Sequence, residues 1–353
     1  MVVLIGLLVY VACHVWTVVP LPRWGKSLAI AIWLCCFLSE FLTFARLADR
    51  MPMGLASAVY NIGNKTIIIT LYILIAFLLL DLGRLLHIVP RSVLHDNIWT
   101  FCVLFVALTA TFIYGSVHYH AKKRIELILD SNGRIEKPVT LVLLSDLHVG
   151  YHNRRSELAR WIDMVNNENP DYVLIAGDII DFSLRPVEEE NMAEEFRRIK
   201  APVYACLGNH EYISGKIKAK QFYDAANIHL LVDTALDAGP LTIVGRDDRS
   251  NSNRQPLNQI VPPGTSNQYT ILLDHQPYHL EEAEKNGIDF QFSGHTHRGQ
   301  VWPISWIVDA MYECSWGSHQ RGSTRYYVSS GIGIWGAKYR IGTQSEYVVA
   351  TIK

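Results

Sequence analysis

The stretch "FQFSGHTHRGQ" (Phe290–Gln300) continues an apolar run and then places two histidines, His295 and His297, one residue apart. In an extended backbone, residues at alternate positions point to the same face, so we expect both imidazoles to leave one side of the chain. A single imidazole in such a place is most often a satisfied polar group. Two that converge are harder to explain unless other parts of the chain bring partners to them.

Four further apolar runs end in polar residues in the same way. They are "VTLVLLSDLH" (139–148), "DYVLIAGDIID" (171–181), "APVYACLGNH" (201–210) and "YTILLDHQP" (269–277). Apolar runs without alternation predict strands that are covered on both faces, as in α/β layers. Helical spacing predicts a helix in "SELARWIDMVNNENP" (156–170), and shorter helical patterns lie at 188–200 and 279–287. We therefore expect an α/β fold.

The charges divide the chain into two unlike parts. It has 353 residues with 32 Lys and Arg, 33 Asp and Glu and a net charge of −1, but residues 1–117 hold only 11 of these charged residues. We expect a multi-pass transmembrane region at 1–117 and a soluble domain at 118–353. The domain opens with "RIELILDSNGRIEKP" (124–138), whose pattern predicts a strand, an Asn-Gly turn and a returning strand. The balanced charge gives no support for nucleic-acid binding.

Four apolar segments predict about four transmembrane helices, at Met1–Pro22, Ser27–Ala45, Thr66–Leu80 and Asn97–Val117. A secretory signal peptide is the alternative for the first segment, which lacks the positively charged start of such signals. Glu40 interrupts the second, and we expect it near a helix end, reaching the headgroups.

The basic residues between these segments predict the orientation. Six Lys and Arg lie on the side of the C-terminal domain and four on the other, which predicts that the C-terminal domain is cytoplasmic. We expect an integral multi-pass protein of a bacterial-type cell membrane.

The five strand ends carry side chains that bind metals. In chain order they are Asp146, His148, Asp178, Asn209, His210, His275, His295 and His297. Catalytic groups in α/β folds gather beyond the carboxyl ends of the strands, so these side chains are expected to meet. Taken singly, each could cap a helix or belong to a turn. Together they form a mixed set of carboxylate, amide and imidazole groups, which suits two divalent ions, Mn, Fe or Zn, more than Mg or Ca.

The series "DLH", "GDIID", "GNHE", a histidine after "ILLD" and "GHTH" resembles the signature of calcineurin-like metallophosphoesterases over about residues 140–350. The resemblance implies an αββα two-sheet sandwich with a dinuclear metal centre. A hydroxide that bridges the two ions would then attack the phosphorus atom. This fold would follow the all-α transmembrane region.

The resemblance also implies a role for each polar residue at the strand ends. Asp178 would bridge the two ions, His210 would be the general acid, and Asp181 would orient His210. One ion would be held by Asp146, His148 and His297, and the other by Asn209, His275 and His295.

"LGNHEYISG" and "SGHTHRGQVWP" resemble the membrane-attached subgroup of this family, which implies cleavage of a phosphodiester or pyrophosphate in a lipid-linked substrate. Many members have Gly or Ala where this chain has Arg298, so we expect Arg298 to contact a substrate phosphate, with a surface salt bridge as the alternative. The aromatic segment Val301–Gly317 is expected to touch the bilayer, unless it is an aromatic core or lid.

Two other functions stay open from the sequence. One is a tethered phosphoesterase for soluble nucleotides or phosphoproteins, and the other is a non-catalytic binding module. The complete set of ligand types argues against the binding module, because a site without function should show gaps.

Overall fold

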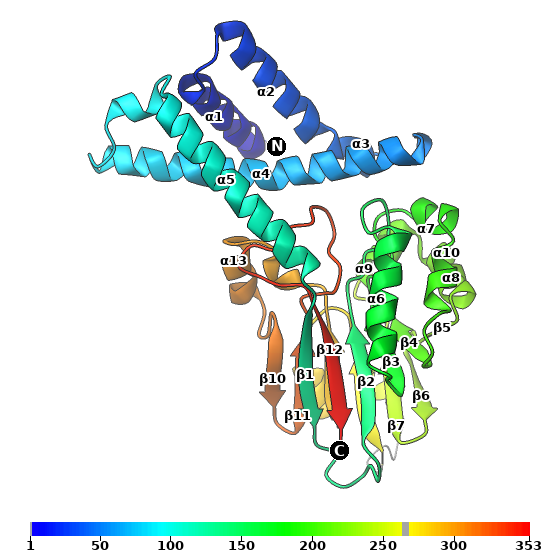
Figure 1. Cartoon of the computed structure of the whole chain (residues 1–353). Coiled ribbons are helices and arrows are strands. Elements are labelled where there is room, and N and C mark those ends of the chain that lie inside the picture. Colours follow the sequence, from blue (N-terminus) through cyan, green and yellow to red (C-terminus); the bar gives the residue numbers. More distant parts are fainter. Residues whose placement is uncertain (1, 263–267) are drawn as a thin grey trace. The chain divides into compact units, whose positions relative to one another are not determined.

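The computed structural model describes residues 2–262 and 268–353, which form two compact units. The first unit comprises Met1–Ser116 with Gly336–Lys338, and the second comprises Val117–Trp335 with Tyr339–Lys353. Figure 1 shows the elements of both units in the order of the chain.

The first unit is helical. Three of its described helical stretches are long and apolar enough to cross a membrane, Arg23–Phe44, Met53–Leu85 and Ile98–His120. The remaining expected segment forms a shorter apolar helix, Val2–Val18, of 17 residues, which is about 25 Å long at 1.5 Å per residue. The expected all-α region of about four helices therefore consists of three long apolar helices and one short one. The elements are α1 (Val2–Val18), α2 (Arg23–Leu38), α3 (Glu40–Phe44), η1 (Ala48–Arg50), α4 (Met53–Leu85), η2 (Arg91–Leu94) and α5 (Ile98–His120).

Glu40 does not reach toward headgroups as expected. Its side chain is buried, and one carboxylate oxygen accepts a hydrogen bond of 2.6 Å from the Asn64 side-chain amide of α4. Gly63 makes this approach possible, because a Cβ there would lie 2.7 Å from the Glu40 backbone nitrogen. The partner is an uncharged amide on another helix, which the apolar pattern around Glu40 does not indicate.

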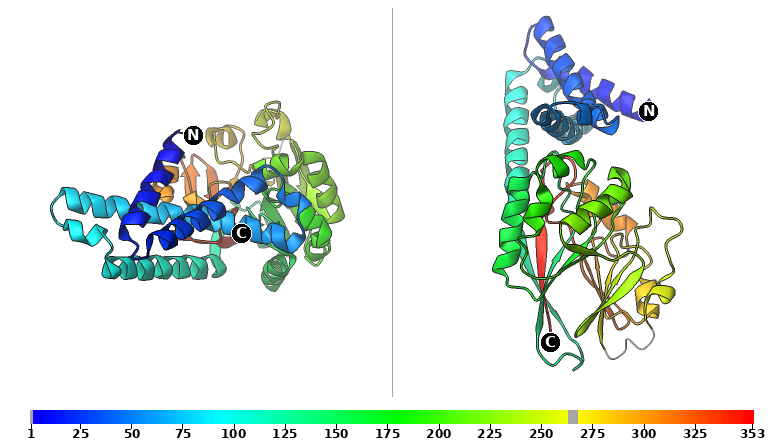
Figure 2. Two further views of the ribbon diagram at one scale, coloured as in Figure 1. Left: turned by 90° about the horizontal axis from the view of Figure 1, so that it is seen from above. Right: turned by 90° about the vertical axis from the view of Figure 1, so that its right-hand side faces the viewer.

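The second unit is built on two six-stranded sheets, which are seen edge-on in the right-hand view of Figure 2. The first sheet has the order β1 (Lys123–Leu129), β12 (Glu346–Ile352), β2 (Val139–Leu144), β3 (Tyr172–Ala176), β4 (Val203–Cys206) and β5 (Ile228–Leu230). The second has the order β10 (Gly317–Arg321), β11 (Thr324–Val328), β9 (Phe290–Ser293), β8 (Tyr269–Leu273), β7 (Leu241–Gly245) and β6 (Thr234–Ala238).

The five apolar runs expected to be strands are β2, β3, β4, β8 and β9. The first three are parallel neighbours in one sheet, and β8 and β9 are parallel neighbours in the other. Parallel strands present their carboxyl ends at one edge of a sheet, so the polar residues that follow them share an edge. The strand that was expected to return after the Asn-Gly turn and pair with β1 is not formed, however. β1 pairs in parallel with β12, and β12 separates it from β2.

Apolar side chains of the two sheets pack face to face, and each sheet is covered by helices on its other face. The core between the sheets includes Leu143, Leu174 and Phe292. Trp161 of α6 and Phe222 of α10 pack in the core outside the first sheet. A third core covers the second sheet. These layers are the expected αββα sandwich. Its helices are α6 (Arg155–Asn167), α7 (Arg185–Glu189), α8 (Met192–Phe196), α9 (Asn209–Ser214), α10 (Lys216–Ala225), α11 (Leu257–Ile260), α12 (Glu281–Lys285), η4 (His297–Gly299) and α13 (Ile304–Met311).

Replacement of Leu143 by alanine tests the core between the sheets. Leu143 is fully buried on β2, and such a truncation leaves a cavity that costs about 2–5 kcal/mol of unfolding free energy. We expect a clearly lower melting temperature of the second unit, followed by circular dichroism of the full chain in detergent. Ile128→Ala on β1, where the side chain is 56% exposed, is the control and should melt close to wild type. Equal melting of both variants would contradict this packing.

Candidate metal centre

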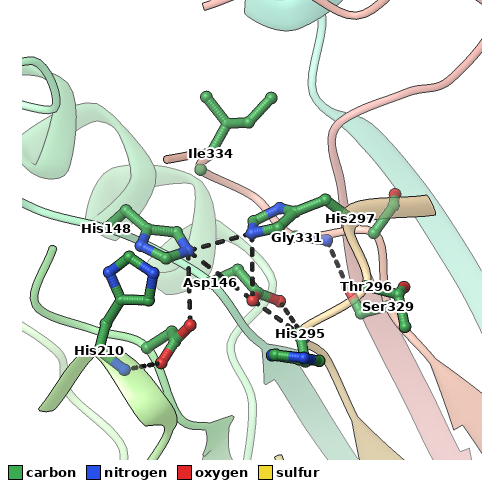
Figure 3. Close-up of polar contacts among 12 residues, drawn as sticks. Asp146, His148, His210, His295, Thr296, His297, Ser329, Gly331 and Ile334 are labelled. Carbon is green, nitrogen blue, oxygen red and sulfur yellow. Dashed lines mark hydrogen bonds and ion pairs between the residues drawn. The ribbon is translucent and has the colours of Figure 1, made fainter. Parts of the chain in front are cut away.

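The backbone takes an unusual conformation where the strands end. Asp146, His148, Asp178, His295 and His297 all have positive φ, between 45° and 72°. This left-handed region is uncommon for residues with a side chain, and such strain is found mostly at functional sites. Each turn of this kind follows directly after β2, β3 or β9. The side chains of Asp146, His148, His295 and His297 lie close together there (Figure 3).

The spacing of His295 and His297 suggested that both side chains leave one face of an extended strand, and this expectation is wrong. β9 ends at Ser293, and the next residues form a tight turn that leads into η4. His297 Nε2 lies 3.5 Å from Asp146 Oδ1, whereas His295 Nδ1 lies 2.8 Å from Asn209 Oδ1. The two imidazoles therefore belong to two different clusters.

The first cluster consists of Asp146, His148 and His297. His148 Nε2 and His297 Nε2 face each other at 3.1 Å, and His148 Nε2 lies 3.8 Å from Asp146 Oδ1. All three side chains are buried. Two imidazole nitrogens at this distance need a proton or a cation near them, because two lone pairs would repel.

The second cluster consists of Asp178, His275 and His295, with Asn209 beside them. His275 Nε2 lies 3.1 Å from Asp178 Oδ2 and 3.2 Å from Asn209 Oδ1. Asp178 Oδ2 is also 3.7 Å from His148 Nε2 of the first cluster. One carboxylate oxygen thus faces both clusters, which is the position of a ligand shared by two ions.

The orientations of the histidine rings fit a metal. His275 Nδ1 is 2.7 Å from the Ala176 carbonyl oxygen, so Nδ1 carries a proton and Nε2, which points toward Asp178, is the nitrogen that would bind a metal. His148 Nδ1 lies 3.3 Å from an Asp181 carboxylate oxygen, which likewise leaves its Nε2 toward the cluster. The ligand atoms within each cluster lie within 4.8 Å of one another. The two clusters are typical of a dimetal phosphoesterase.

Asp181 lies between two histidines. One of its oxygens is 3.3 Å from His148 Nδ1 and 3.4 Å from His210 Nδ1. Burial alone would raise the pKa of Asp181, but the contacts from His148 and His210 hold that pKa well below its usual range. The carboxylate is therefore ionised at neutral pH and can hold both rings. The His210 backbone N–H in turn donates to Asp178 Oδ1 at 2.8 Å.

Glu211 organises two strand ends, a role that the sequence analysis missed. It is fully buried, and its carboxylate accepts hydrogen bonds from the backbone N–H groups of Asp178, Ile180 and Gly208. Burial, together with the nearby charge of Asp178, raises the pKa of Glu211 to about 7. The available signal was the last letter of "GNHE", because a Glu three residues after a helix N-cap can accept a hydrogen bond from the N-cap backbone N–H, as Glu211 does from Gly208 at the start of α9.

Two glycines let the ligand loops come together. A Cβ at Gly208 would lie 2.1 Å from Asp178 Oδ1, and a Cβ at Gly294 would lie 2.3 Å from Asp146 Oδ2. No side chain fits at such distances, so the glycines of "LGNH" and "SGHTH" are required by the approach of the carboxylates.

Arg340 holds the backbone around the metal centre in place, and the sequence analysis missed this residue as well. Its side chain is fully buried and donates to the carbonyl oxygens of His297, at 2.7 Å, of Ser330, and of Gly333, at 3.2 Å. Burial lowers the pKa of Arg340 to about 10, so it remains a cation at neutral pH. The Gly333 N–H also donates to the Asp146 carbonyl. Arg340 thus ties the loop after β11 to both metal-ligand loops.

Replacement of Arg340 by methionine should destabilise the centre. The change leaves several buried carbonyl groups without donors, at about 1–3 kcal/mol for each unsatisfied group. We expect a lower melting temperature and weaker Mn²⁺ binding in a calorimetric titration of the full chain. Arg198→Met, which removes an exposed guanidinium paired with Glu195 and Asp163, is the control. Mn²⁺ affinity equal to wild type in Arg340→Met would contradict this role.

Arg298 stands beside the first cluster in a strained conformation, with φ of 50° and ψ of 38°. Its guanidinium carbon lies 4.2 Å from the centre of the Trp316 ring, and its Nε lies 3.9 Å from Asp309 Oδ1. The ion pair is at the limit of contact and contributes little. The aromatic segment itself is divided, since Trp302 and Trp316 are half-buried and Trp306 is exposed.

A two-sheet sandwich with two joined clusters of carboxylate and imidazole groups defines the class of dinuclear metallohydrolases. Comparison with known proteins agrees with this class. The family profile described as calcineurin-like phosphoesterase matches residues 139–299. The chain is 30% identical over 259 residues to an uncharacterized metallophosphoesterase of Campylobacter jejuni, covering 70% of this chain and 68% of that protein. The chain belongs to the calcineurin-like metallophosphoesterase family and is a metal-dependent phosphoric ester hydrolase.

Two further similarities cover different parts of the chain. A protein of Danio rerio described as a transmembrane protein with metallophosphoesterase domain is 26% identical over 360 residues, which covers 95% of this chain and 82% of that protein. The crystal structure of a 5'-nucleotidase precursor from Thermus thermophilus aligns with a TM-score of 0.35 and 17% identity, over 56% of this chain and 50% of that one.

Proposed function

We propose that this protein is a membrane-anchored phosphoesterase that hydrolyses a phosphodiester or pyrophosphate bond in a lipid-linked substrate. The observation that carries the proposal is the pair of clusters joined by Asp178, in a chain that also contains three long apolar helices. The relative named as a transmembrane protein is similar over almost the whole of this chain, which supports the anchoring.

The seven residues of the two clusters would hold two divalent ions, Mn, Fe or Zn. Asp146, His148 and His297 would hold one, Asn209, His275 and His295 the other, and Asp178 would bridge them. Such ions supply a water of lowered pKa as nucleophile and neutralise charge on the phosphoryl oxygens. The mixture of nitrogen and oxygen ligands supports a transition metal over Mg²⁺ or Ca²⁺.

His210 would act as the general acid for the leaving oxygen. It lies directly after Asn209 at the start of α9, and its side chain is partly open to solvent. Asp181 is 3.4 Å from His210 Nδ1, so that nitrogen is held by a carboxylate. The other ring nitrogen, Nε2, is then available to give a proton to the departing alkoxide or phosphate.

The side of the membrane is proposed from the distribution of charge. From the sequence, six Lys and Arg lie on the side of the catalytic domain and four on the opposite side. Lys65 lies inside α4 and is no longer counted, so the numbers become five and four. We place the catalytic domain in the cytoplasm on this basis. The placement is tested with a single cysteine introduced at Ile128, which is 56% exposed, in a chain whose Cys13, Cys35, Cys36 and Cys102 are replaced by alanine. If the catalytic domain is cytoplasmic, an impermeant reagent should label this cysteine in opened cells but not in intact ones.

A tethered enzyme for soluble nucleotides or phosphoproteins is the alternative. It uses the same chemistry, so the substrate decides between the two. A panel of phosphodiester, phosphomonoester and lipid pyrophosphate substrates should be assayed with the full chain and Mn²⁺. The proposal requires the highest kcat/KM on a lipid-linked member, and a preference for soluble nucleotides would favour the alternative.

Replacement of His210 by glutamine should lower kcat by about 10²–10⁴-fold on an alkyl phosphodiester, because the alkoxide then leaves without a proton. The loss should be much smaller on a p-nitrophenyl ester, whose leaving group is already stable as an anion. Asp178→Ala is the matched control and should abolish activity on both esters together with metal binding. An equal loss on both esters in His210→Gln would show that His210 is not the acid.

Arg298 is proposed to contact a phosphate of the substrate. The Trp316 ring positions the guanidinium in the loop that follows His297. The ion pair with Asp309 is weak, so it does not compete strongly with a phosphate. We expect Arg298→Ala to raise KM with little change in kcat, since bidentate phosphate contacts are lost in both ground and transition states. Arg198→Ala, on the surface, is the control. Unchanged KM on every substrate would reduce Arg298 to a surface residue.

A further inference from the structure

Helix α13 (Ile304–Met311) exposes its apolar face. Trp306, Ile307 and Met311 are 66%, 59% and 63% exposed, whereas Ser305 is buried. At about 100° per residue, Trp306, Ala310, Ile307 and Met311 fall within about 140° of the helix circumference, and all four are exposed, so they form one apolar face. A helix on a globular domain normally buries this face and exposes its serine. In α13 the arrangement is inverted.

This face is a local feature of the second unit. The other large apolar side chains that are exposed there lie on different elements, such as Ile128 on β1 and Leu236 on β6. Scattered apolar residues of that kind are normal on protein surfaces, but three on one turn and a half of helix mark an interaction site. The half-buried Trp302 packs against this face: its ring centre is 5.5 Å from that of Trp306, and the two rings are nearly perpendicular.

α13 is firmly attached to the first metal cluster. It begins shortly after His297, and the Thr296 hydroxyl donates to the Ser315 carbonyl at 2.6 Å, beyond the other end of the helix. The Ser315 hydroxyl donates in turn to Asp309 of α13. A Cβ at Gly299 would lie 2.7 Å from the Ile304 carbonyl carbon, so the ligand loop and the helix are in close contact. What binds α13 is therefore held beside the centre.

The chain itself indicates the occupant of this face. α5 ends at His120 and β1 begins at Lys123, so only two residues connect an apolar helix long enough to cross a bilayer to the catalytic domain. Such a short tether gives even a small apolar face a high effective concentration at a membrane surface. A dimer would need about 1,000 Å² of buried surface, far more than three side chains on one short helix provide.

We propose that α13 is an interfacial segment that inserts Trp306, Ile307 and Met311 into the boundary between headgroups and acyl chains. The exposed polar residue on the helix is Asp309, an acid. Insertion is therefore driven by apolar burial and does not depend on anionic lipids. The inference rests on the membrane anchoring in the proposed function, but not on the identity of the substrate. It gives the enzyme a means of holding its metal centre at the level of lipid headgroups.

Spin labels on the full chain in phosphatidylcholine nanodiscs test the insertion. Cys13, Cys35, Cys36 and Cys102 are first replaced by alanine, while Cys206 and Cys314 are buried and can stay. A nitroxide is then placed at Met311→Cys. Its collisions with oxygen, which dissolves in lipid, are compared with its collisions with a water-soluble nickel complex. We expect oxygen to dominate at position 311.

Ile128→Cys is the matched control. Ile128 is 56% exposed, and it pairs through Thr351 of β12 with the start of β2, at the edge of the sheet opposite the centre. The nickel complex should dominate there. Introducing Trp306→Asp and Ile307→Asp into the Met311→Cys chain should shift the label at 311 toward the nickel complex, because the remaining face is too small to insert.

Three results would overturn the proposal. The label at 311 could be as accessible to nickel as that at 128, it could be shielded from both reagents as in a protein contact, or the aspartates could leave it unchanged. A label on Cys102 of α5, in a second chain that keeps Cys102 and lacks only Cys13, Cys35 and Cys36, separates this failure from failure of the anchoring. If oxygen dominates at position 102 while the nickel complex dominates at position 311, the membrane anchoring is supported and the interfacial role of α13 is refuted.

Discussion

Three carboxylates, Asp146, Asp178 and Asp181, are buried at one edge of the sandwich. Like charges in a place of low dielectric repel strongly, and their burial is costly unless each is paired. Imidazoles and backbone N–H groups surround them, including the N–H of His210 on Asp178 and that of His295 on Asp146. Two divalent cations would complete this neutralisation. The apolar cores on both sides of the first sheet hold in place groups that would otherwise separate.

Much of the sandwich could be predicted, because its central strands are continuous apolar runs that end abruptly in polar residues. What could not be predicted was the pairing of strands distant in sequence. Asn132 and Gly133 suggested a hairpin, and no local pattern indicated that β12 would lie between β1 and β2. The length of one helix, expected at Thr66–Leu80, was underestimated for a related reason. Hydropathy locates apolar stretches, but α4 continues through the more polar residues before Thr66.

The residues of the centre were predictable where their side chains carry the chemistry. Those that support it were not, because they bind backbone groups. Arg340 looks like any surface arginine in "AKYRIG", yet it is fully buried and holds three carbonyl groups. Glu211 binds N–H groups of two loops in the same way. The spacing of His295 and His297 predicted that both side chains lie on one face of a strand. Both residues instead have positive φ, and their rings lie in separate clusters.

The place of β12 in the first sheet has a consequence for biogenesis. This strand is far from β1 and β2 in the sequence, yet it hydrogen-bonds to both. During translation β1 and β2 leave the ribosome early and have to wait, with unpaired edges, until β12 has been synthesised. Contacts of such long range slow folding and expose strands to wrong partners. The nascent enzyme thus passes through a period in which its apolar helices are complete but its hydrolytic half is not, so chaperone protection would matter most then.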